Sequence, residues 1–131
     1  MPLRSASCSY GQLRLTVSEE PIRVSVCHCV ACQRRAGSVF GAQARLSRHA
    51  VQVSGESPAY VRIGDEGDRT TFHFCPKFVA TVHYPSEGHE EHIAVPVGAF
   101  VEPGFPAPSL SVYEERMHSW VGLLSPMEHM A

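Results

Sequence analysis

The sequence has little charge and no cluster of basic residues. Charged residues make up 18% of its 131 residues, and the formal net charge is −2. Without a Lys/Arg-rich run, nothing in the electrostatics predicts binding to nucleic acid. No apolar run is long enough to cross a bilayer, and residues 1–5 lack the apolar block of a secretory signal. We therefore expect a cytoplasmic protein that does not insert into membranes and whose thiols stay reduced.

The composition is that of a globular protein, with 44% hydrophobic residues. A chain of this length is most simply one domain, spanning residues 1–131. It is also long enough to bury a core of its own, so it does not need metal ions or disulfides merely to fold.

Hydrophobic residues recur mostly at every second position, which predicts β-strands. The predicted strands cover residues 13–17, 22–26, 51–53, 60–63, 72–74, 79–84, 92–97 and 110–113. One short helix is expected at 30–35, ended by Gly37. Residues 102–109 contain three prolines and should form an irregular loop. The pattern predicts an all-β domain with at most one short helix.

Three of the five cysteines lie within six residues, as Cys27, Cys29 and Cys32. In a reducing compartment, clustered cysteines indicate metal binding or reactivity rather than disulfides. Thiolates favour zinc, and a zinc ion with only three protein ligands keeps a position for water or substrate. His28 lies between two of these cysteines, a place that turns its side chain away from the metal, so a role next to the ligands or toward substrate is expected.

Three motifs occur in order along the chain. The first, at 7–14, has a cysteine and a glycine before a strand. The second, at 27–40, combines the three cysteines with Arg34, Arg35 and a Gly-Ser-x-Phe sequence, and the third, at 74–79, begins Phe-Cys-Pro. With the tail at 95–98 and 112–120, the sequence resembles the glutathione-dependent formaldehyde-activating enzyme family, whose relatives include centromere protein V.

The resemblance implies a fold of coiled β-sheets with zinc-binding loops. It also implies two zinc sites, a catalytic one from the second motif and a structural one from the first and third. The catalytic set is complete here, but Tyr10 and Phe78 stand where the structural set has its other two cysteines. Only Cys8 and Cys75 remain of that degenerate structural site, so we expect one Zn²⁺ per chain.

Three interpretations of Cys8 and Cys75 stay open. In the first, they are inert buried thiols beside Tyr10 and Phe78, whose side chains would fill the space of a lost ion. Alternatively, they form a disulfide, or they recruit a histidine such as His73 or His83 to rebuild a metal site. The first is favoured, because both missing ligands are replaced by large side chains.

The activity implied by the resemblance is that of a carbon–sulfur lyase related to S-hydroxymethylglutathione synthase. Its partners would be a thiol such as glutathione and a small aldehyde such as formaldehyde. Cys27, Cys29 and Cys32 would be the catalytic metal ligands. His28, Arg34 and Arg35 are candidates for substrate binding, since Arg binds carboxylates through a planar pair of N–H donors.

Two other functions fit the sequence. One is a zinc-carrying scaffold without catalysis, and the other is a redox sensor whose clustered thiols oxidise and release metal. Among the remaining candidates, Phe40 and Trp120 are expected in the core. The histidines at 49, 89, 92 and 129 are expected at the surface without a role.

Overall fold

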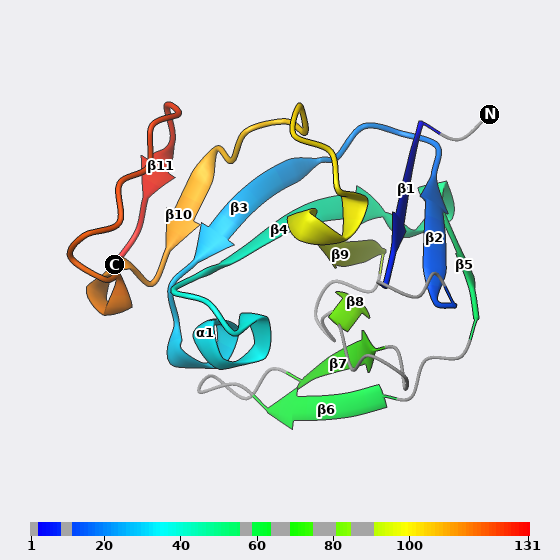
Figure 1. Cartoon of the computed structure of the whole chain (residues 1–131), viewed down its shortest axis with the longest axis horizontal. Helices are drawn as coiled ribbons and strands as arrows, with labels where there is room; N and C mark the ends of the chain where they lie inside the picture. The colour runs from blue at the N-terminus through cyan, green and yellow to red at the C-terminus, as the bar shows by residue number, and fades with distance from the viewer. Residues whose placement is uncertain (1–2, 9–11, 56–58, 64–68, 75–80, 85–90) are drawn as a thin grey trace.

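In the part of the chain that the structure describes, the protein consists mostly of β-strands, with one short α-helix beside them (Figure 1). The computed structural model describes residues 3–8, 12–55, 59–63, 69–74, 81–84 and 91–131. The central sheet has five strands, in the spatial order β11 (Glu128–His129), β10 (Leu110–Val112), β3 (Arg23–Cys27), β4 (Gly41–Ser47) and β9 (His92–Pro96). The observed architecture agrees with the predicted all-β class.

The register of this sheet brings three chain segments together at one end. Strand β3 is antiparallel to β4, with Cys27 opposite Gly41, and parallel to β10, with Cys27 opposite Val112. Helix α1 (Val30–Ala36) starts three residues after β3 ends, and it lies below that end of the sheet in Figure 1. The cysteine motif therefore sits where a central strand turns into the α-helix.

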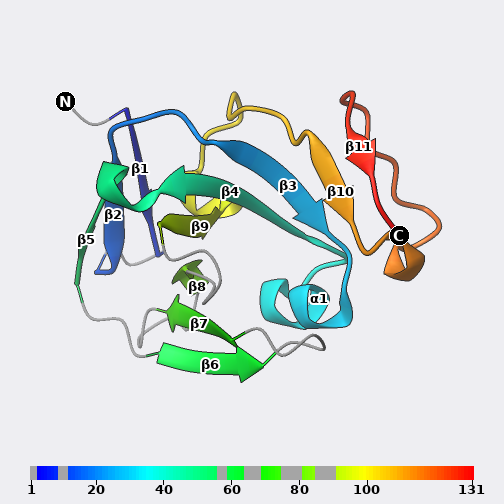
Figure 2. The ribbon, with the colours of Figure 1, turned by 180° about the vertical axis from the view of Figure 1, so that it is seen from behind.

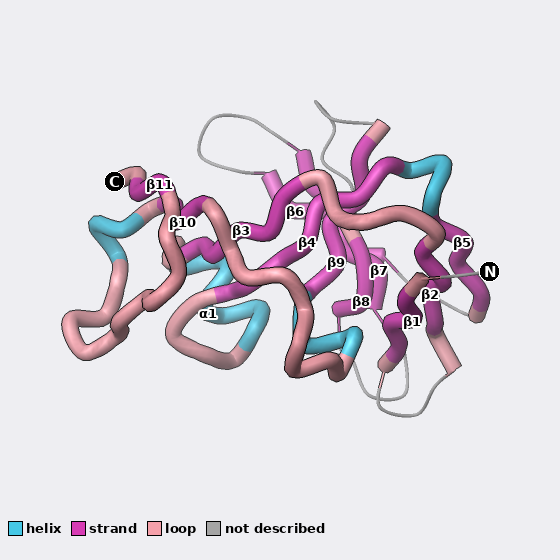
Figure 3. The backbone as a smooth tube through the Cα atoms, turned by 90° about the horizontal axis from the view of Figure 1, so that it is seen from above, coloured by secondary structure: helices cyan, strands magenta, loops and turns pink. Residues whose placement is uncertain are grey.

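Two smaller antiparallel sheets complete the fold. One contains β1 (Arg4–Ser7), β2 (Arg14–Val17) and β5 (Val51–Ser54), and the other contains β6 (Ala59–Ile63), β7 (Arg69–Phe74) and β8 (Thr81–His83). Seen from behind, the β6–β7–β8 sheet lies below the central sheet (Figure 2). In the view from above, β10 and β11 lie at one end of the molecule and β1, β2 and β5 at the other (Figure 3).

Short 3-10 helices and one isolated bridge connect these sheets. The 3-10 helices among the described residues are η1 (Arg48–Ala50), η3 (Val97–Phe100) and η4 (Glu114–Arg116). The bridge pairs Tyr84, just after β8, with Ala94 in β9. This bridge links the β6–β7–β8 sheet to the central sheet and fixes the position of the Tyr84 ring near α1.

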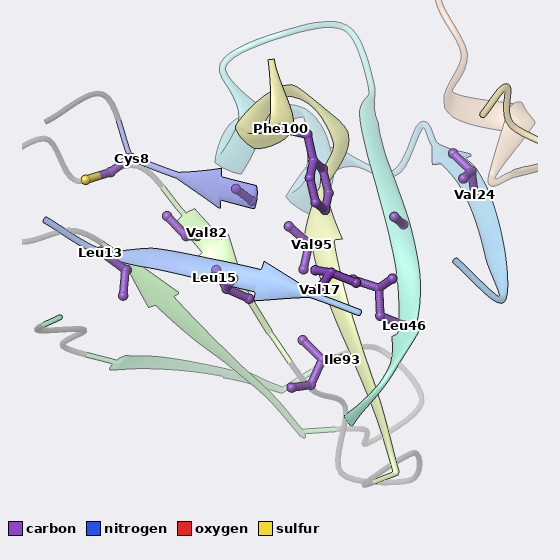
Figure 4. Packing of buried hydrophobic residues seen from close by; sticks show 12 residues of the cluster. Cys8, Leu13, Leu15, Val17, Val24, Leu46, Val82, Ile93, Val95 and Phe100 are labelled. Carbon is purple, nitrogen blue, oxygen red and sulfur yellow. The ribbon is translucent and has the colours of Figure 1, made fainter. Parts of the chain in front are cut away.

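The core lies between the central sheet and the β1–β2–β5 sheet. Leu13, Leu15 and Val17 are completely buried, and they pack with residues of β4, β8, β9 and η3, as shown in Figure 4. Alternation at every second residue places all three side chains on the same face of the strand, and full burial of each stabilises the fold by about 2 kcal/mol. This core contains no member of the Cys27–Cys32 motif.

Most predicted elements are found within a few residues of their expected bounds. Helix α1 extends one residue beyond the prediction, and Gly37 ends it in the left-handed conformation with φ 63°. Strands β1, β4 and β11 were not predicted. In β4 the buried positions include Gly41 and Ala44, whose small side chains produce no clear hydrophobic alternation.

One aromatic residue differs from expectation. Trp120 is 72% exposed, and its ring meets that of His118 edge-on, with the centroids 5.9 Å apart. The core prediction for Trp120 is therefore wrong, because the residue follows η4 in a segment that runs outside the core cluster. Phe40 is half-buried.

Candidate metal centre

The three clustered cysteines meet at the junction of β3 and α1. Cys27 is the last residue of β3, Cys29 precedes the helix, and Cys32 lies in its first turn. Their Sγ atoms all lie within 4.8 Å of one another. Cys27 is buried, whereas Cys29 and Cys32 are half-buried. Three sulfur ligands this close could hold a metal ion.

Helix capping accounts for the local arrangement of two of these sulfurs. Cys29 is the N-cap of α1, in an extended conformation, and its Sγ accepts a hydrogen bond from the Cys32 backbone N–H at 3.3 Å. An N-cap side chain bonds to the N–H groups of the first turn, which are otherwise left without a partner. The C-x-x-C spacing therefore both starts the helix and brings two sulfurs to the same end of it.

The pKa values of the Cys27 and Cys32 thiols are shifted in opposite directions. A hydrogen bond donated by the Cys27 thiol lowers the pKa of Cys32, and the positive charge of Arg35 acts in the same direction against the effect of burial. The hydrogen bond to Cys32, followed by burial, raises the pKa of Cys27. The Cys32 sulfur is therefore the first of the two to become a thiolate, the form that binds metals.

Arg35 is a charged side chain that lies beside the sulfurs. Its guanidinium carbon lies 4.9 Å from the ring centroid of Phe72 and 4.6 Å from that of Tyr84. It also donates hydrogen bonds to the side chains of Cys32 and Tyr84. A Cβ atom on Gly41 would lie 3.1 Å from Arg35 Nη2 and 3.5 Å from Cys32 Cβ, so the glycine leaves room for the guanidinium. The two rings and the Cys32 side chain thus hold the guanidinium in the space that Gly41 leaves open.

The neighbouring Arg34 is placed differently. Its side chain is exposed, whereas that of Arg35 is half-buried. The two residues follow each other in a helix and therefore project about 100° apart around its axis. The structure separates two candidates that the sequence could not distinguish, and Arg35 is the one beside the thiols.

His28 is completely buried. Its Nε2 lies 3.0 Å from Ser111 Oγ in β10, and its ring meets Phe40 edge-on, with the centroids 5.7 Å apart. Burial also lowers the pKa of His28. The contact with Ser111 joins the end of β3 to β10, while the role of His28 toward a substrate stays a prediction.

Gln33 is a residue of the site that the sequence analysis missed. Its side-chain amide donates to the backbone oxygens of His28, at 2.7 Å, and Arg116, at 3.2 Å. Its Oε1 lies 3.0 Å from Nε2 of His118. This amide ties the cysteine loop to the segment after η4. Its position directly after Cys32 was the one available signal.

The degenerate structural site is described in part. Cys8 is 3% exposed and belongs to the hydrophobic core cluster (Figure 4). Cys75, Tyr10 and Phe78 lie outside the described residues. The interpretation of Cys8 as a buried apolar residue therefore agrees with its surroundings, while its relation to Cys75 stays a prediction.

The two histidines proposed for a rebuilt site stack on each other. The rings of His73 and His83 lie 4.3 Å apart with an interplanar angle of 6°. His83 is buried, and neither of its ring nitrogens has a hydrogen-bond partner among the residues that the structure describes. Burial, with the nearby charges of His73 and Arg48, lowers the pKa of His83 to about 4. His83 is thus held neutral in the folded protein.

The histidines expected at the surface are partly accounted for. His49 and His129 are exposed, and each contacts a glutamate, Glu19 at 3.0 Å and Glu114 at 2.6 Å. His92 is half-buried in β9, and His89 lies outside the described residues.

Comparisons with known proteins agree with this picture. A family model described as "Glutathione-dependent formaldehyde-activating enzyme" matches residues 3–116. A crystal structure of a Rhodobacter sphaeroides protein shares the fold, with a TM-score of 0.57 and 19% identity over 78% of this chain and 90% of that one. None of the curated proteins compared with the chain matches it. Within the described part of the chain, no helix is long and apolar enough to span a membrane.

Proposed function

The chain belongs to the glutathione-dependent formaldehyde-activating enzyme family, and from this premise we propose that it joins a thiol to a small aldehyde at a metal ion held by Cys27, Cys29 and Cys32. The observation that carries the proposal is the grouping of three Sγ atoms within 4.8 Å, which no fourth Cys, His, Asp or Glu ligand atom of the described residues joins. In the reverse direction the same protein would act as a carbon–sulfur lyase. We place it in the cytoplasm, where the thiols stay reduced.

Zinc fits the chemistry of this ligand set. Soft thiolates bind it well, and the site would take one ion per chain. When bound, a zinc ion would supply an open coordination position at which a substrate thiol is held as its thiolate near neutral pH. Cys29 and Cys32 are only half-buried, which supports access of a small molecule to the sulfurs.

The protein's own residues would bind and orient the reactants. Arg35, fixed by Phe72 and Tyr84 beside Cys32, would offer its remaining N–H donors to a carboxylate of the thiol. Burial raises the pKa of Tyr84 to about 12, so the phenol stays neutral and does not cancel the charge of Arg35.

The reaction needs no oxidant or other reactant. The substrate sulfur forms a bond to the carbonyl carbon, and the π electron pair of the carbonyl moves to its oxygen. The proton lost by the thiol is regained at that oxygen, which gives a hydroxymethyl thioether from formaldehyde. The reverse sequence of steps breaks the carbon–sulfur bond.

The test combines calorimetry with exchange kinetics. Glutathione is titrated into zinc-loaded wild type, Cys29→Ser and Val53→Ala, and the exchange between formaldehyde and its glutathione adduct is followed by NMR. We expect binding and accelerated exchange in the wild type and in Val53→Ala, whose side chain does not line the cavity beside Arg35, and loss of both in Cys29→Ser, since a hydroxyl ionises less readily than a thiol. Equal affinity and equal exchange in all three proteins would refute the proposed function.

A further inference from the structure

We propose that a cavity beside Arg35 binds the apolar arm of a mercaptocarboxylate, with its single carboxylate paired to Arg35. The inference rests on the proposed function in one respect, since the bound molecule is taken to be the thiol substrate. It goes beyond that function by naming a substrate class that differs from glutathione.

The cavity has a volume of about 540 Å³, within the range of about 300–1,000 Å³ that is usual for small-molecule sites. Four elements or their flanks contribute its apolar wall, through Phe40 before β4, Val82 in β8, Pro96 at the end of β9 and Ala99 in η3. Val82 also belongs to the hydrophobic core cluster (Figure 4). An apolar group that enters this cavity leaves water for a preformed apolar surface.

The charge of the cavity selects among ligands. Arg35 is the one charged side chain among the described residues that line it, and Ser7 and Cys8 add a hydroxyl and a thiol. No acidic side chain of the described lining would pair with an ammonium group. Glutathione carries two carboxylates and one ammonium, so it would leave charges unpaired here at a cost in free energy. A ligand with one carboxylate and an apolar arm matches the cavity.

Arg35 retains hydrogen-bonding capacity for such a carboxylate. A guanidinium has five N–H donors, and its hydrogen-bond partners among the described residues are Cys32 and Tyr84. Its face is covered by the rings of Phe72 and Tyr84, which leaves the edge of the group for a ligand. The cation is therefore oriented before any ligand binds.

The contact between Arg35 and Cys32 also limits the ligand's length. A carboxylate paired with Arg35 lies next to the sulfur cluster, because the guanidinium itself hydrogen-bonds Cys32. A thiol on the same molecule reaches that cluster only if few bonds separate it from the carboxylate. This favours 2-mercapto and 3-mercapto acids, with the apolar arm directed along the cavity away from the sulfurs.

The first experiment measures the pocket apart from any metal chemistry. The probe is 3-phenylpropionate, which has a carboxylate and an apolar ring but no thiol, titrated calorimetrically into metal-free protein. We expect saturable binding that weakens about tenfold or more in Arg35→Met and less than about twofold in Arg34→Met, because a charge-assisted hydrogen bond contributes on that scale. Equal losses in the two variants would overturn the role of Arg35.

The second experiment fills the cavity. Gly98 lines it, and a Cβ atom built there meets nothing within 4 Å. Gly104 offers the same open space but does not line the cavity, so Gly104→Leu is the matched control for Gly98→Leu. Gly98→Leu should weaken binding of the probe about tenfold while Gly104→Leu retains it. Equal affinity in the two variants would place the probe elsewhere.

The third experiment tests the substrate class on zinc-loaded protein. We expect 2-mercapto-3-phenylpropionate to bind about tenfold or more tightly than glutathione. Tighter binding of glutathione would overturn the inference and leave the proposed function intact. Conversely, 3-phenylpropionate binding that depends on Arg35 and Gly98, without any thiol–aldehyde exchange, would retain the pocket and refute the proposed function.

Discussion

The protein contains cysteines in two contrasting environments. At the junction of β3 and α1, three sulfurs lie within 4.8 Å of one another, and a guanidinium contacts one of them. At the end of β1, Cys8 is 3% exposed and packs in the hydrophobic core cluster. A cation and neighbouring sulfurs favour the thiolate, whereas apolar surroundings favour the neutral thiol. The same residue type could therefore bind a metal ion in one region, whereas it packs as a small apolar group in the other.

The difference should appear first in metal binding. We expect about one tightly held zinc ion per chain, and we expect Cys29→Ser to lower the affinity about 1,000-fold, or about 4 kcal/mol. Cys8→Ala should change it little. Competition with a chromophoric chelator measures the affinity, and elemental analysis measures the stoichiometry. Two tightly held ions per chain would show that the Cys8 region also binds metal.

The core should matter more for stability than the metal does. Removing the ion with a chelator should leave the circular dichroism spectrum largely unchanged, since the cysteine motif lies outside the core cluster. Leu15→Ala should lower the free energy of unfolding by about 3 kcal/mol, because Leu15 is completely buried.

Urea denaturation checks both expectations. Val53 pairs with Leu15 across the sheet but is 42% exposed, so Val53→Ala should cost about 0.5 kcal/mol or less. Cooperative unfolding on chelation would contradict the contrast, because it would make the metal structural.

The core region should also respond to acid through His83. Its pKa is about 4 in the folded protein against an ordinary value of 6.5. Below pH 6.5 the unfolded chain binds a proton that the folded protein resists, so stability falls as the pH drops from about 6.5 toward 4. The loss at pH 5 relative to pH 7.5 should be about 2 kcal/mol.

The measurement is urea denaturation of wild type, His83→Phe and His49→Phe across this pH range. His83→Phe should flatten the pH dependence, while the exposed His49 should contribute little. If His83→Phe retained the full wild-type slope, another group would be responsible for it.

The smallest effect concerns the end of α1. Gly37 has φ 63°, and a Cβ atom there would meet nothing within 4 Å. Gly37→Ala should therefore cost only the strain of the left-handed conformation, about 1 kcal/mol. Gly104→Ala, at an ordinary φ with equally open space, should be close to neutral. Because the sulfurs lie at the other end of the helix, zinc affinity should change less than about threefold in either variant, and a large loss would link the two helix ends.

Much of the fold could be predicted where local patterns are strong. Leu13, Leu15 and Val17 alternate and are all buried in and beside β2. The short helix was predicted from its stop signal at Gly37. Strand β4 was missed, although it is hydrogen-bonded to both β3 and β9, because its buried positions include Gly41 and Ala44. Their burial follows from pairing with distant strands and not from their own hydrophobicity.

The sequence by itself determined the grouping of Cys27, Cys29 and Cys32, because closely spaced residues in a strand-to-helix turn stay close in any fold. Only the tertiary structure decided which other residues join them. Arg35 rather than Arg34 faces the sulfurs because Tyr84, far along the chain, is fixed beside α1 by its bridge to β9. Likewise, the contact with Ser111 encloses His28, and the two residues are 83 positions apart. Local patterns report periodicity and spacing, whereas such long-range neighbours depend on how the sheets pair and pack.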